Sequence, residues 1–430
     1  MKILIKNGRL IDPYNNIDEQ MDLLVKDGKV CKIEKNISED ADKTIDAQNM
    51  WVAPGFIDLH VHLREPGYEH KETIETGTKS AVMGGFTTIC CMPNTKPVTD
   101  NEILVEYIKM KAEKEGVCKV LPIGAITVGQ KGENLSDIGK MAKAGACAIS
   151  EDGFTVENAS IMKTAIKYAQ MFNIPVFSHC EDVNLAGGSM NAGDRATMLG
   201  LKGISNDSED VIVARDIILA DSLKAPIHLC HISTKGAVEL IKDAKARGSK
   251  VTAEATPHHF TLVDEDITDY DANYKMNPPL RSIQDRAAII EGLKNDTIEV
   301  IATDHAPHHI DEKNCEFERA LSGIVGLETA VSLAITELVQ KDVLTPFKMV
   351  EKFTKNPAKV LRREDLGNLS IGSNADIVII DPNQTYKINV ENFLSKGKNS
   401  PFNNREVTGK VLYTLVDGKI VVENGNIVGA

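Results

Sequence analysis

The sequence has few cysteines, few aromatic residues and no long apolar run. Only eight cysteines and 5% aromatic residues occur among 430 residues, and no two cysteines are spaced as Cys-x-x-Cys. Cysteines this sparse do not make a disulfide scaffold, so we expect reduced, buried thiols. No apolar segment approaches the ~18–20 residues of a membrane span, and the N-terminal residues lack the apolar stretch of a signal peptide. We therefore expect a cytoplasmic protein that makes no membrane contact.

The sequence also lacks an excess of positive charge. Its 49 Lys and Arg residues stand against 62 Asp and Glu residues, which gives a formal net charge of −13. A chain this acidic, without a local basic patch, is not expected to bind nucleic acid or anionic lipid. The hydrophobic fraction of 42% is ordinary for a globular protein, and it supplies enough apolar side chains for a large core.

The middle of the chain alternates short β-rich runs with helical segments. Eight β-rich runs lie within residues 54–360, and helical patterns between them include 101–115, 156–172, 208–224, 235–248 and 282–295. This α/β alternation predicts a closed parallel (β/α)8 barrel over 54–360. Residues 1–53 and 361–430 both contain short apolar or alternating runs separated by Asn-Gly or Asp-Gly, a pattern that predicts short strands joined by turns. We expect the two termini to form one small β-sandwich domain together.

The polar, charged segment 308–326 follows the eighth predicted strand. Loops after the strands of such barrels usually contact the substrate, so we interpret this segment as a lid over the barrel mouth. A surface loop without a role is the alternative.

Histidines and carboxylates gather at the predicted ends of the barrel strands. The residues are His60 and His62 after strand one, Asp152 after strand four, His179 after strand five, His231 after strand six and Asp304 after strand eight. A His-x-His pair on a strand places both rings on one face, because side-chain direction repeats every two residues. Imidazole and carboxylate ligands without thiolate suit zinc, with manganese or cobalt as substitutes.

The number of candidate ligands favours two metal ions. His60, His62 and Asp304 can serve one ion, His179 and His231 the other, and Asp152 together with a hydroxide can bridge them. Two cations would lower the pKa of the shared water and polarise a substrate carbonyl. Asp304 is then the predicted catalytic residue, since it can take a proton from the attacking water and deliver it to the leaving nitrogen.

Six segments carry a resemblance to a known family. They are PGFIDLHVHLREPG (54–67), CMPNT (91–95), SEDG (150–153), MNPPLR (276–281), ATDHAPH (302–308) and GNLSIGSNADIVIID (367–381). With them the chain resembles the amidohydrolase superfamily and, within it, the bacterial class I dihydroorotase family. The resemblance implies reversible cyclisation of N-carbamoyl-L-aspartate to L-dihydroorotate in pyrimidine synthesis, a (β/α)8 barrel and a zinc cofactor. It also implies a homodimer and a possible association with aspartate transcarbamoylase.

The resemblance also implies roles for individual residues. The six strand-end residues match the family's metal ligands, and the matches to its substrate contacts are His62, Arg64, Asn94, Asn277, His308, Ser322 and Gly323. Ser322 and Gly323 stand where relatives often carry Pro-Phe-Gly, and they would contribute backbone contacts. Arg64 lies two residues beyond His62 and would face the site if the strand continued that far, where its guanidinium suits a substrate carboxylate. For Asn277, a turn-forming role is the alternative.

Other functions compete with this one. Allantoinases and dihydropyrimidinases usually have a carboxylated lysine where this chain has Asp152, and allantoinases tend to replace the arginine that corresponds to Arg64. A non-catalytic scaffold of the same superfamily would have lost metal ligands, whereas all six positions are filled here. His258 and His259 are expected to be structural, and His305 is expected to face away from the site.

Overall fold

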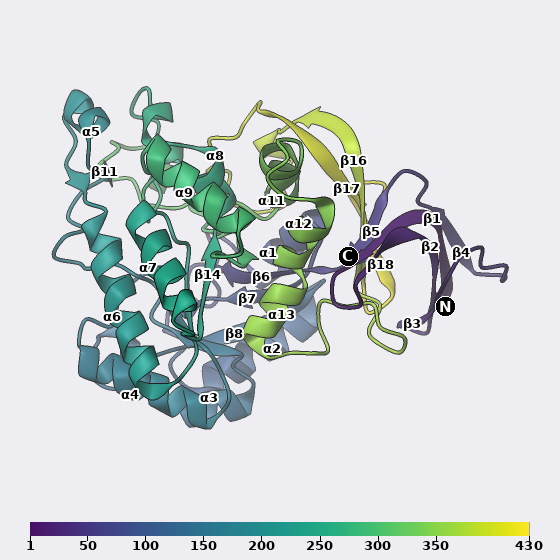
Figure 1. The fold of residues 1–430 in the computed structure, drawn as a ribbon, viewed down its shortest axis with the longest axis horizontal. Coiled ribbons are helices and arrows are strands. Elements are labelled where there is room, and N and C mark those ends of the chain that lie inside the picture. The colour runs from purple at the N-terminus through teal and green to yellow at the C-terminus, as the bar shows by residue number, and fades with distance from the viewer. Residues whose placement is uncertain (430) are drawn as a thin grey trace.

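The barrel lies beside a mixed sheet in the computed structural model, which describes residues 1–429 (Figure 1). Eight parallel strands follow one another in chain order: β6 (Phe56–Val61), β7 (Phe86–Cys91), β8 (Lys119–Ala125), β9 (Ala148–Ser150), β10 (Val176–Ser178), β13 (Ile227–Leu229), β14 (Val251–Ala255) and β15 (Val300–Ile301). Nearly every residue of these strands is buried, as expected for a parallel sheet covered by helices. The predicted (β/α)8 barrel is confirmed.

The first and last strands of the barrel are joined by a buried carboxylate. Asp58 on β6 accepts hydrogen bonds from the Thr303 amide at 3.1 Å and the Thr303 hydroxyl at 2.6 Å. The His62 amide donates to the His305 carbonyl at 2.8 Å, and Val61 forms a parallel bridge with His305. Burial raises the pKa of Asp58 to about 7, although its hydrogen bonds oppose this. These contacts bring the C-terminal ends of β6 and β15 side by side.

Helices cover the outside of the barrel (Figure 1). They are α1 (Ile74–Met83), α2 (Glu102–Glu115), α3 (Ile138–Ala144), α4 (Ala159–Met171), α6 (Asp207–Leu223), α7 (Lys235–Ala246), α9 (Ile283–Lys294), α11 (Ala330–Ala334), α12 (Pro346–Phe353) and α13 (Lys355–Leu361). The five helical segments predicted from the sequence are confirmed as α2, α4, α6, α7 and α9. Side-chain caps explain where two of these helices begin. The Asn101 side chain caps the N-terminus of α2, and the Ser282 side chain caps that of α9.

Short elements occupy the connections. They are β11 (Met190–Asn191), β12 (Gly203–Ile204), α5 (Asp194–Leu199), α8 (Pro257–Thr261), α10 (Ile310–Lys313) and the turns η1 (Val128–Gln130), η2 (Asp264–Asp266), η3 (Ala272–Tyr274), η4 (Ile335–Val339) and η5 (Val390–Asn392). The predicted loop 308–326 contains α10 and is otherwise irregular. Its motion as a lid stays a prediction.

Both termini build the second sheet, as predicted. Its nine strands are β1 (Lys2–Asp12), β2 (Ile17–Lys26), β3 (Lys29–Glu34), β4 (Lys43–Asp46), β5 (Trp51–Pro54), β16 (Ile377–Lys387), β17 (Glu406–Val416), β18 (Lys419–Glu423) and β19 (Asn426–Ile427). Strand β5 joins the two halves, because it pairs in parallel with β1 and antiparallel with β16. Along β1, Ile3 and Ile5 belong to one apolar cluster and Leu4 to another, so both faces of the sheet are covered.

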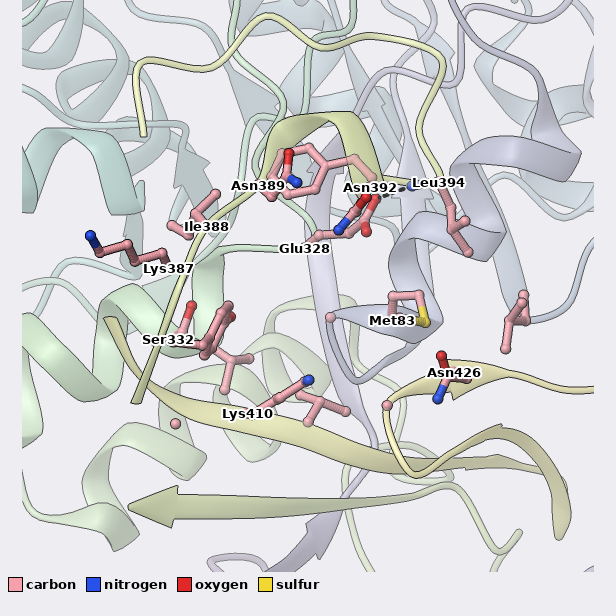
Figure 2. A pocket seen from close by; sticks show the side chains of 18 residues that line it. Met83, Glu328, Ser332, Lys387, Ile388, Asn389, Asn392, Leu394, Lys410 and Asn426 are labelled. Carbon is pink, nitrogen blue, oxygen red and sulfur yellow. Dashed lines mark hydrogen bonds between the residues drawn. The ribbon is translucent and has the colours of Figure 1, made fainter. Parts of the chain in front are cut away.

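A segment between β16 and β17 leaves this sheet and lies against the barrel. We call residues 393–400 the strap. The Leu394 amide donates to the Glu328 carboxylate at 2.8 Å (Figure 2), and the Lys396 amide donates to Glu72 at 3.2 Å. Glu72 also accepts from the Ser395 hydroxyl. No local sequence pattern predicted that a C-terminal segment reaches the barrel.

Two expectations from the sequence concern the cysteines and the helices: reduced thiols and no membrane-spanning segment. All eight cysteines are free, and five of them are buried. Within residues 1–429, no helix combines the length and the apolarity that a membrane crossing requires.

A cluster of three phenylalanines packs where the barrel begins. The rings of Phe56 and Phe353 lie 5.1 Å apart, those of Phe86 and Phe353 lie 5.9 Å apart, and all three side chains are fully buried. We expect Phe353→Ala to lower the free energy of unfolding by about 3–5 kcal/mol, because it leaves a cavity under two strands. Urea unfolding measures this change. Ile103→Ala is the control, since Ile103 is 71% exposed. An equal loss in both variants would contradict the assignment of this core.

Candidate active site

The six predicted metal-ligating side chains form one buried cluster at the C-terminal end of the barrel. They are His60, His62, Asp152, His179, His231 and Asp304, and none is more than 6% exposed. His60 lies on β6, and the others follow β6, β9, β10, β13 and β15 within three residues. This is the end of the barrel at which such folds build their sites.

Asp152 lies at the centre of the cluster. Its Oδ1 atom is 3.2 Å from His60 Nε2, 3.5 Å from His179 Nδ1 and 3.6 Å from His231 Nε2. Its Oδ2 atom is 3.4 Å from His62 Nε2. One carboxylate therefore faces all four imidazoles, two of them from β6 and two from the opposite strands.

Asp304 completes one side of the cluster. Its Oδ1 atom lies 3.1 Å from His62 Nε2 and 3.5 Å from His60 Nε2. Burial raises the pKa of Asp304, but His60 and His62 outweigh this and hold the pKa below its usual range. In turn, burial lowers the pKa of His60, but Asp152 and Asp304 outweigh this and raise it well above 6.5. The two carboxylates thus favour bound positive charge among the rings.

These donor atoms fit a metal ion. His60 Nε2 and Asp152 Oδ1 are buried and form no hydrogen bond of acceptable geometry, although they lie only 3.2 Å apart. Among the six predicted ligands, two sets of atoms lie close enough together to share one ion: His60, His62 and Asp304, and His60, Asp152 and His231. His179 falls outside both sets, but its Nδ1 atom lies 2.9 Å from His231 Nε2. Nitrogen and carboxylate donors without thiolate are typical ligands of zinc and related ions.

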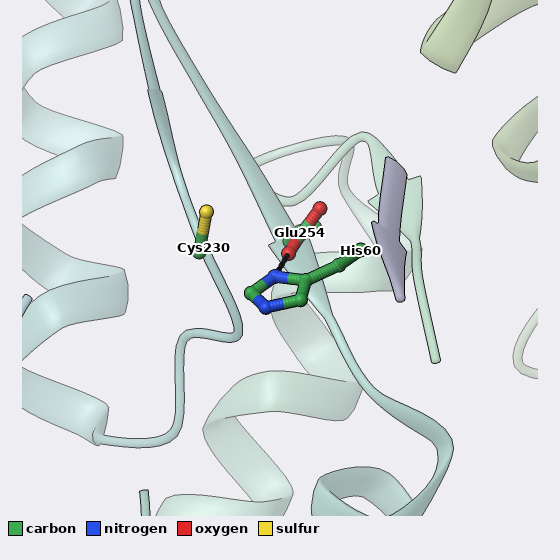
Figure 3. A group of neighbouring side chains, drawn as sticks. All are labelled: His60, Cys230 and Glu254. Atoms are coloured by element: carbon green, nitrogen blue, oxygen red, sulfur yellow. Dashed lines mark hydrogen bonds and ion pairs between the residues drawn. The ribbon is translucent and has the colours of Figure 1, made fainter. Parts of the chain in front are cut away.

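A buried glutamate on β14 orients His60 (Figure 3). Glu254 Oε1 accepts a hydrogen bond from His60 Nδ1 at 2.9 Å, and Oε2 accepts from His228 Nε2 at 3.0 Å. Because Nδ1 is held by Glu254, Nε2 is the ring nitrogen of His60 that is directed into the cluster. The Cys230 sulfur lies within 4.8 Å of a ring nitrogen of His60 and of the Glu254 carboxylate, and burial raises the pKa of its thiol. The group of His60, Cys230 and Glu254 is therefore a support for His60.

Asn94 holds the second histidine of the His-x-His pair. His62 Nδ1 donates to Asn94 Oδ1 at 2.9 Å, which leaves His62 Nε2 facing Asp152 and Asp304. Asn94 lines the cavity, and its amide nitrogen donates no hydrogen bond to another group of residues 1–429.

A cavity of about 250 Å³ opens on this cluster. Its wall contains every residue predicted to contact substrate: His62, Arg64, Asn94, Asn277, His308, Ser322 and Gly323. The other lining residues are Asp152, Gly153, His179, His231, Asp304, Ala306 and Leu321. This volume lies just below the roughly 300–1,000 Å³ of pockets for drug-sized ligands, so the cavity suits only a small molecule.

Arg64 reaches the cavity by a route that the sequence analysis described wrongly. Strand β6 ends at Val61, and Arg64 has a left-handed backbone with φ of +62°, so strand geometry does not continue to it. The turn redirects the side chain, whose Nε donates to the Pro307 carbonyl at 3.2 Å. His231 and Asp304 also have positive φ values, as residues at functional sites often do. No carboxylate within residues 1–429 forms an ion pair with Arg64.

His308 and Asn277 line the other side of the cavity. His308 Nε2 donates to the Ser322 carbonyl at 2.8 Å. Burial and the nearby cations Arg64 and Lys71 lower the pKa of His308 to about 3, so its ring is neutral. Asn277 Oδ1 is buried without a hydrogen-bond partner. The Gly323 amide donates to the Lys275 carbonyl at 3.0 Å.

His259 and His305 agree with the expectations, whereas His258 is not a fully hydrogen-bonded structural histidine. His259 bonds Thr256 and the Pro278 carbonyl, and His305 contacts Glu72 at 3.3 Å, away from the cluster. His258 is buried with an unpaired Nε2. Sequence reasoning missed Glu254, although an acidic residue inside the apolar run VTAEATPH was a signal for a buried partner.

The chain matches known protein families over most of its length. Residues 50–237 match a family profile described as dihydro-orotase-like, and residues 320–422 match one described as amidohydrolase family. Proteins named dihydroorotase from Acetivibrio thermocellus and Geotalea daltonii are 53% and 51% identical, and each alignment covers 98% of this chain and 99% of the relative. The solved structure of an L-hydantoinase (dihydropyrimidinase) from Arthrobacter aurescens matches with a TM-score of 0.90 at 27% identity, covering 99% of this chain and 97% of that one.

Fold and site together define an amidohydrolase, a class of hydrolases that implies a bound metal cofactor. Within that class, this chain belongs to the dihydroorotase family.

The contact between Glu254 and His60 generates a prediction about metal binding. We expect Glu254→Ala to weaken metal affinity about 10–100-fold, because His60 loses the partner that directs its Nε2 into the cluster. Metal content after dialysis against a graded chelator series measures this. Asp22→Ala is the control, since Asp22 is equally buried but accepts only from the amides of Asn7 and Ile37 in the second sheet. Equal metal affinity in Glu254→Ala and wild type would contradict the orienting role.

Proposed function

We propose that this protein is a dihydroorotase, which interconverts N-carbamoyl-L-aspartate and L-dihydroorotate in pyrimidine synthesis. One observation carries the choice among cyclic amides: the guanidinium of Arg64 lines the cavity beside the metal-ligand cluster and has no carboxylate partner of its own. A substrate that carries a carboxylate outside the reacting amide satisfies this cation. Dihydropyrimidine and hydantoin rings without that carboxylate leave it unpaired.

We further propose one or two zinc ions as the cofactor, held by His60, His62 and Asp304 and by His179 and His231, with Asp152 between them. When bound, such ions lower the pKa of water and polarise the amide carbonyl of the substrate. The donor set and the central place of Asp152 support this assignment.

The residues across the cavity would bind and orient the substrate. Arg64 and the free amide nitrogen of Asn94 donate to the carboxylate, and neutral His308 lies next to Arg64, with its Nε2 3.5 Å from Arg64 Nη2. The unpaired Asn277 Oδ1 can accept from a ring N–H. Ser322 and Gly323 form the wall against which the ring lies. The substrate is thereby held by its carboxylate at one end and its ring at the other.

Asp304 would carry the proton. In hydrolysis a water oxygen bonds to the ring carbonyl carbon, the carbon–nitrogen bond breaks, and the nitrogen gains a proton. Asp304 lies at the junction of cluster and cavity, so its carboxylate can take the proton from water and deliver it to that nitrogen. In cyclisation the ureido nitrogen bonds to the carboxyl carbon and a carbon–oxygen bond of that group breaks. The Asp304 carboxylate takes the proton from the nitrogen and delivers it to the departing oxygen, which leaves as water with a second proton from solvent.

The assembly and location of the protein are proposals from the resemblance alone. We propose a cytoplasmic homodimer that can associate with aspartate transcarbamoylase, and size-exclusion chromatography with and without that enzyme tests the assembly.

The role of Arg64 gives a prediction about substrate choice. We expect Arg64→Met to raise the KM for L-dihydroorotate about 10- to 100-fold, because a buried charge-assisted contact to the carboxylate is lost. Turnover of dihydrouracil, which has the ring without the carboxylate, should not fall in the variant. Ultraviolet absorbance loss measures both reactions on protein of known metal content. A parallel loss on both substrates would contradict carboxylate recognition by Arg64.

Asp304 gives a second prediction. We expect Asp304→Asn to lower kcat about 10²–10⁴-fold, since the amide keeps the shape of the side chain but cannot accept the proton. Metal content of the variant is measured in parallel, because Asp304 is also a proposed ligand. A variant that keeps both metal and wild-type kcat would exclude Asp304 as the proton carrier. Metal-loaded wild-type protein that does not hydrolyse L-dihydroorotate would overturn the proposed function.

A further inference from the structure

One side chain from the strap joins two segments of the cavity wall. Asn399 Oδ1 accepts from the His308 amide at 3.0 Å. Its Nδ2 atom donates to the carbonyls of Ala306 and Gly323, both at 3.0 Å. Asn399 is only 3% exposed, so all three bonds form away from solvent. His308 and Gly323 are both residues of the substrate cavity, and they belong to the segments after β15 and after α10.

The backbone of the strap is also tied to this wall. The Val325 amide donates to the Asn399 carbonyl at 3.0 Å. Gly397 lies so close to Pro307 that a Cβ atom placed on it would stand 2.6 Å from the Pro307 ring. The strap therefore packs directly on the segment that leads from Asp304 to His308.

A buried lysine holds the same wall from the other side. Lys313 Nζ donates to the carbonyls of Leu321 at 2.9 Å, Lys275 at 3.1 Å and Gly323 at 3.2 Å. The Gly323 carbonyl thus accepts from both Lys313 and Asn399. Of the two side chains, Asn399 alone also bonds the segment of His308.

The strap has anchors that do not depend on Asn399. Glu328 accepts from the Leu394 and Ser395 amides beside a larger cavity of about 690 Å³ (Figure 2), and Glu72 accepts from Ser395 and Lys396. Loss of the Asn399 side chain should therefore leave the strap attached. We expect the loss to make the two segments of the cavity wall more mobile instead.

We propose that Asn399 is a positioning residue of the substrate cavity, which acts through His308 and Gly323 and is supplied by the C-terminal segment rather than by the barrel. The inference rests on the proposed function, because the substrate that it positions is the one proposed above. Rigid support of this kind matters, since small displacements of substrate-contacting groups are costly to catalysis.

The test compares Asn399→Ala and Asn399→Asp with Asn403→Ala. Asn403 follows the strap and is exposed. Within residues 1–429 its side chain accepts only from the Val390 amide, so Asn403→Ala controls for general loosening of this segment. In Asn399→Asp, one oxygen keeps the bond to the His308 amide and the other opposes the carbonyls of Ala306 and Gly323. We expect KM for L-dihydroorotate to rise about tenfold or more in both Asn399 variants, with unchanged metal content. Asn403→Ala should keep the wild-type KM.

A double-mutant cycle separates positioning from a merely structural role. If Asn399 acts through His308, the effects of Asn399→Ala and His308→Ala on KM are less than additive, because they remove the same contact to substrate. Additive effects, or a lowered melting temperature with wild-type KM, would overturn the proposal.

Hydrogen exchange gives a readout that does not depend on the reaction. Peptides that cover 304–309 and 320–326 should exchange faster in Asn399→Ala than in wild type or Asn403→Ala. Unchanged exchange there would overturn the inference even if KM rises. If metal-loaded wild-type protein does not turn over L-dihydroorotate, the proposed function fails, and the exchange result still decides whether Asn399 orders the cavity wall.

Discussion

Buried negative charge that requires a cation is the constraint on which the site depends. Asp152 and Asp304 are nearly inaccessible to solvent and face four imidazoles at 3.1–3.6 Å. Carboxylates buried in this way are unfavourable unless protons or a metal ion compensate them. The surrounding protein determines which compensation is possible. Glu254 accepts a hydrogen bond from His60 Nδ1 and Asn94 accepts one from His62 Nδ1, so the Nε2 atoms of both rings point at the carboxylates.

The closed barrel is what makes this cluster possible. Its six side chains come from strands one, four, five, six and eight, and they meet because parallel strands end at one mouth. Asp58 has a particular part in this arrangement. By bonding Thr303 it joins the last strand to the first, which sets Asp304 against His60 and His62.

The substrate side of the site is built differently from the metal side. The proposed metal ligands lie at strand ends, whereas Arg64, His308 and Gly323 lie on irregular segments that need outside support. Lys313 supplies part of that support from within the loop 308–326, and Asn399 supplies the rest from the strap. The second sheet therefore does more than cover one side of the barrel, because a segment between two of its strands completes the wall of the cavity.

Much of the fold and of the candidate site was predictable from the sequence, because both depend on local patterns. The alternation of β-rich and helical segments predicted the barrel and its eight strands. Position at a strand end, together with residue chemistry, predicted the six residues of the cluster. The family resemblance predicted Arg64 in the site, but the condition that strand geometry continues to it is not met, since a left-handed turn follows the strand. Only the tertiary structure decided that Glu254 orients His60 and that Asn399 joins two loops. Glu254 and His60 are 194 residues apart in the sequence, and Asn399 and His308 are 91 residues apart. Contacts between such distant residues have no local pattern, because they arise only when the barrel closes and the strap packs on its mouth.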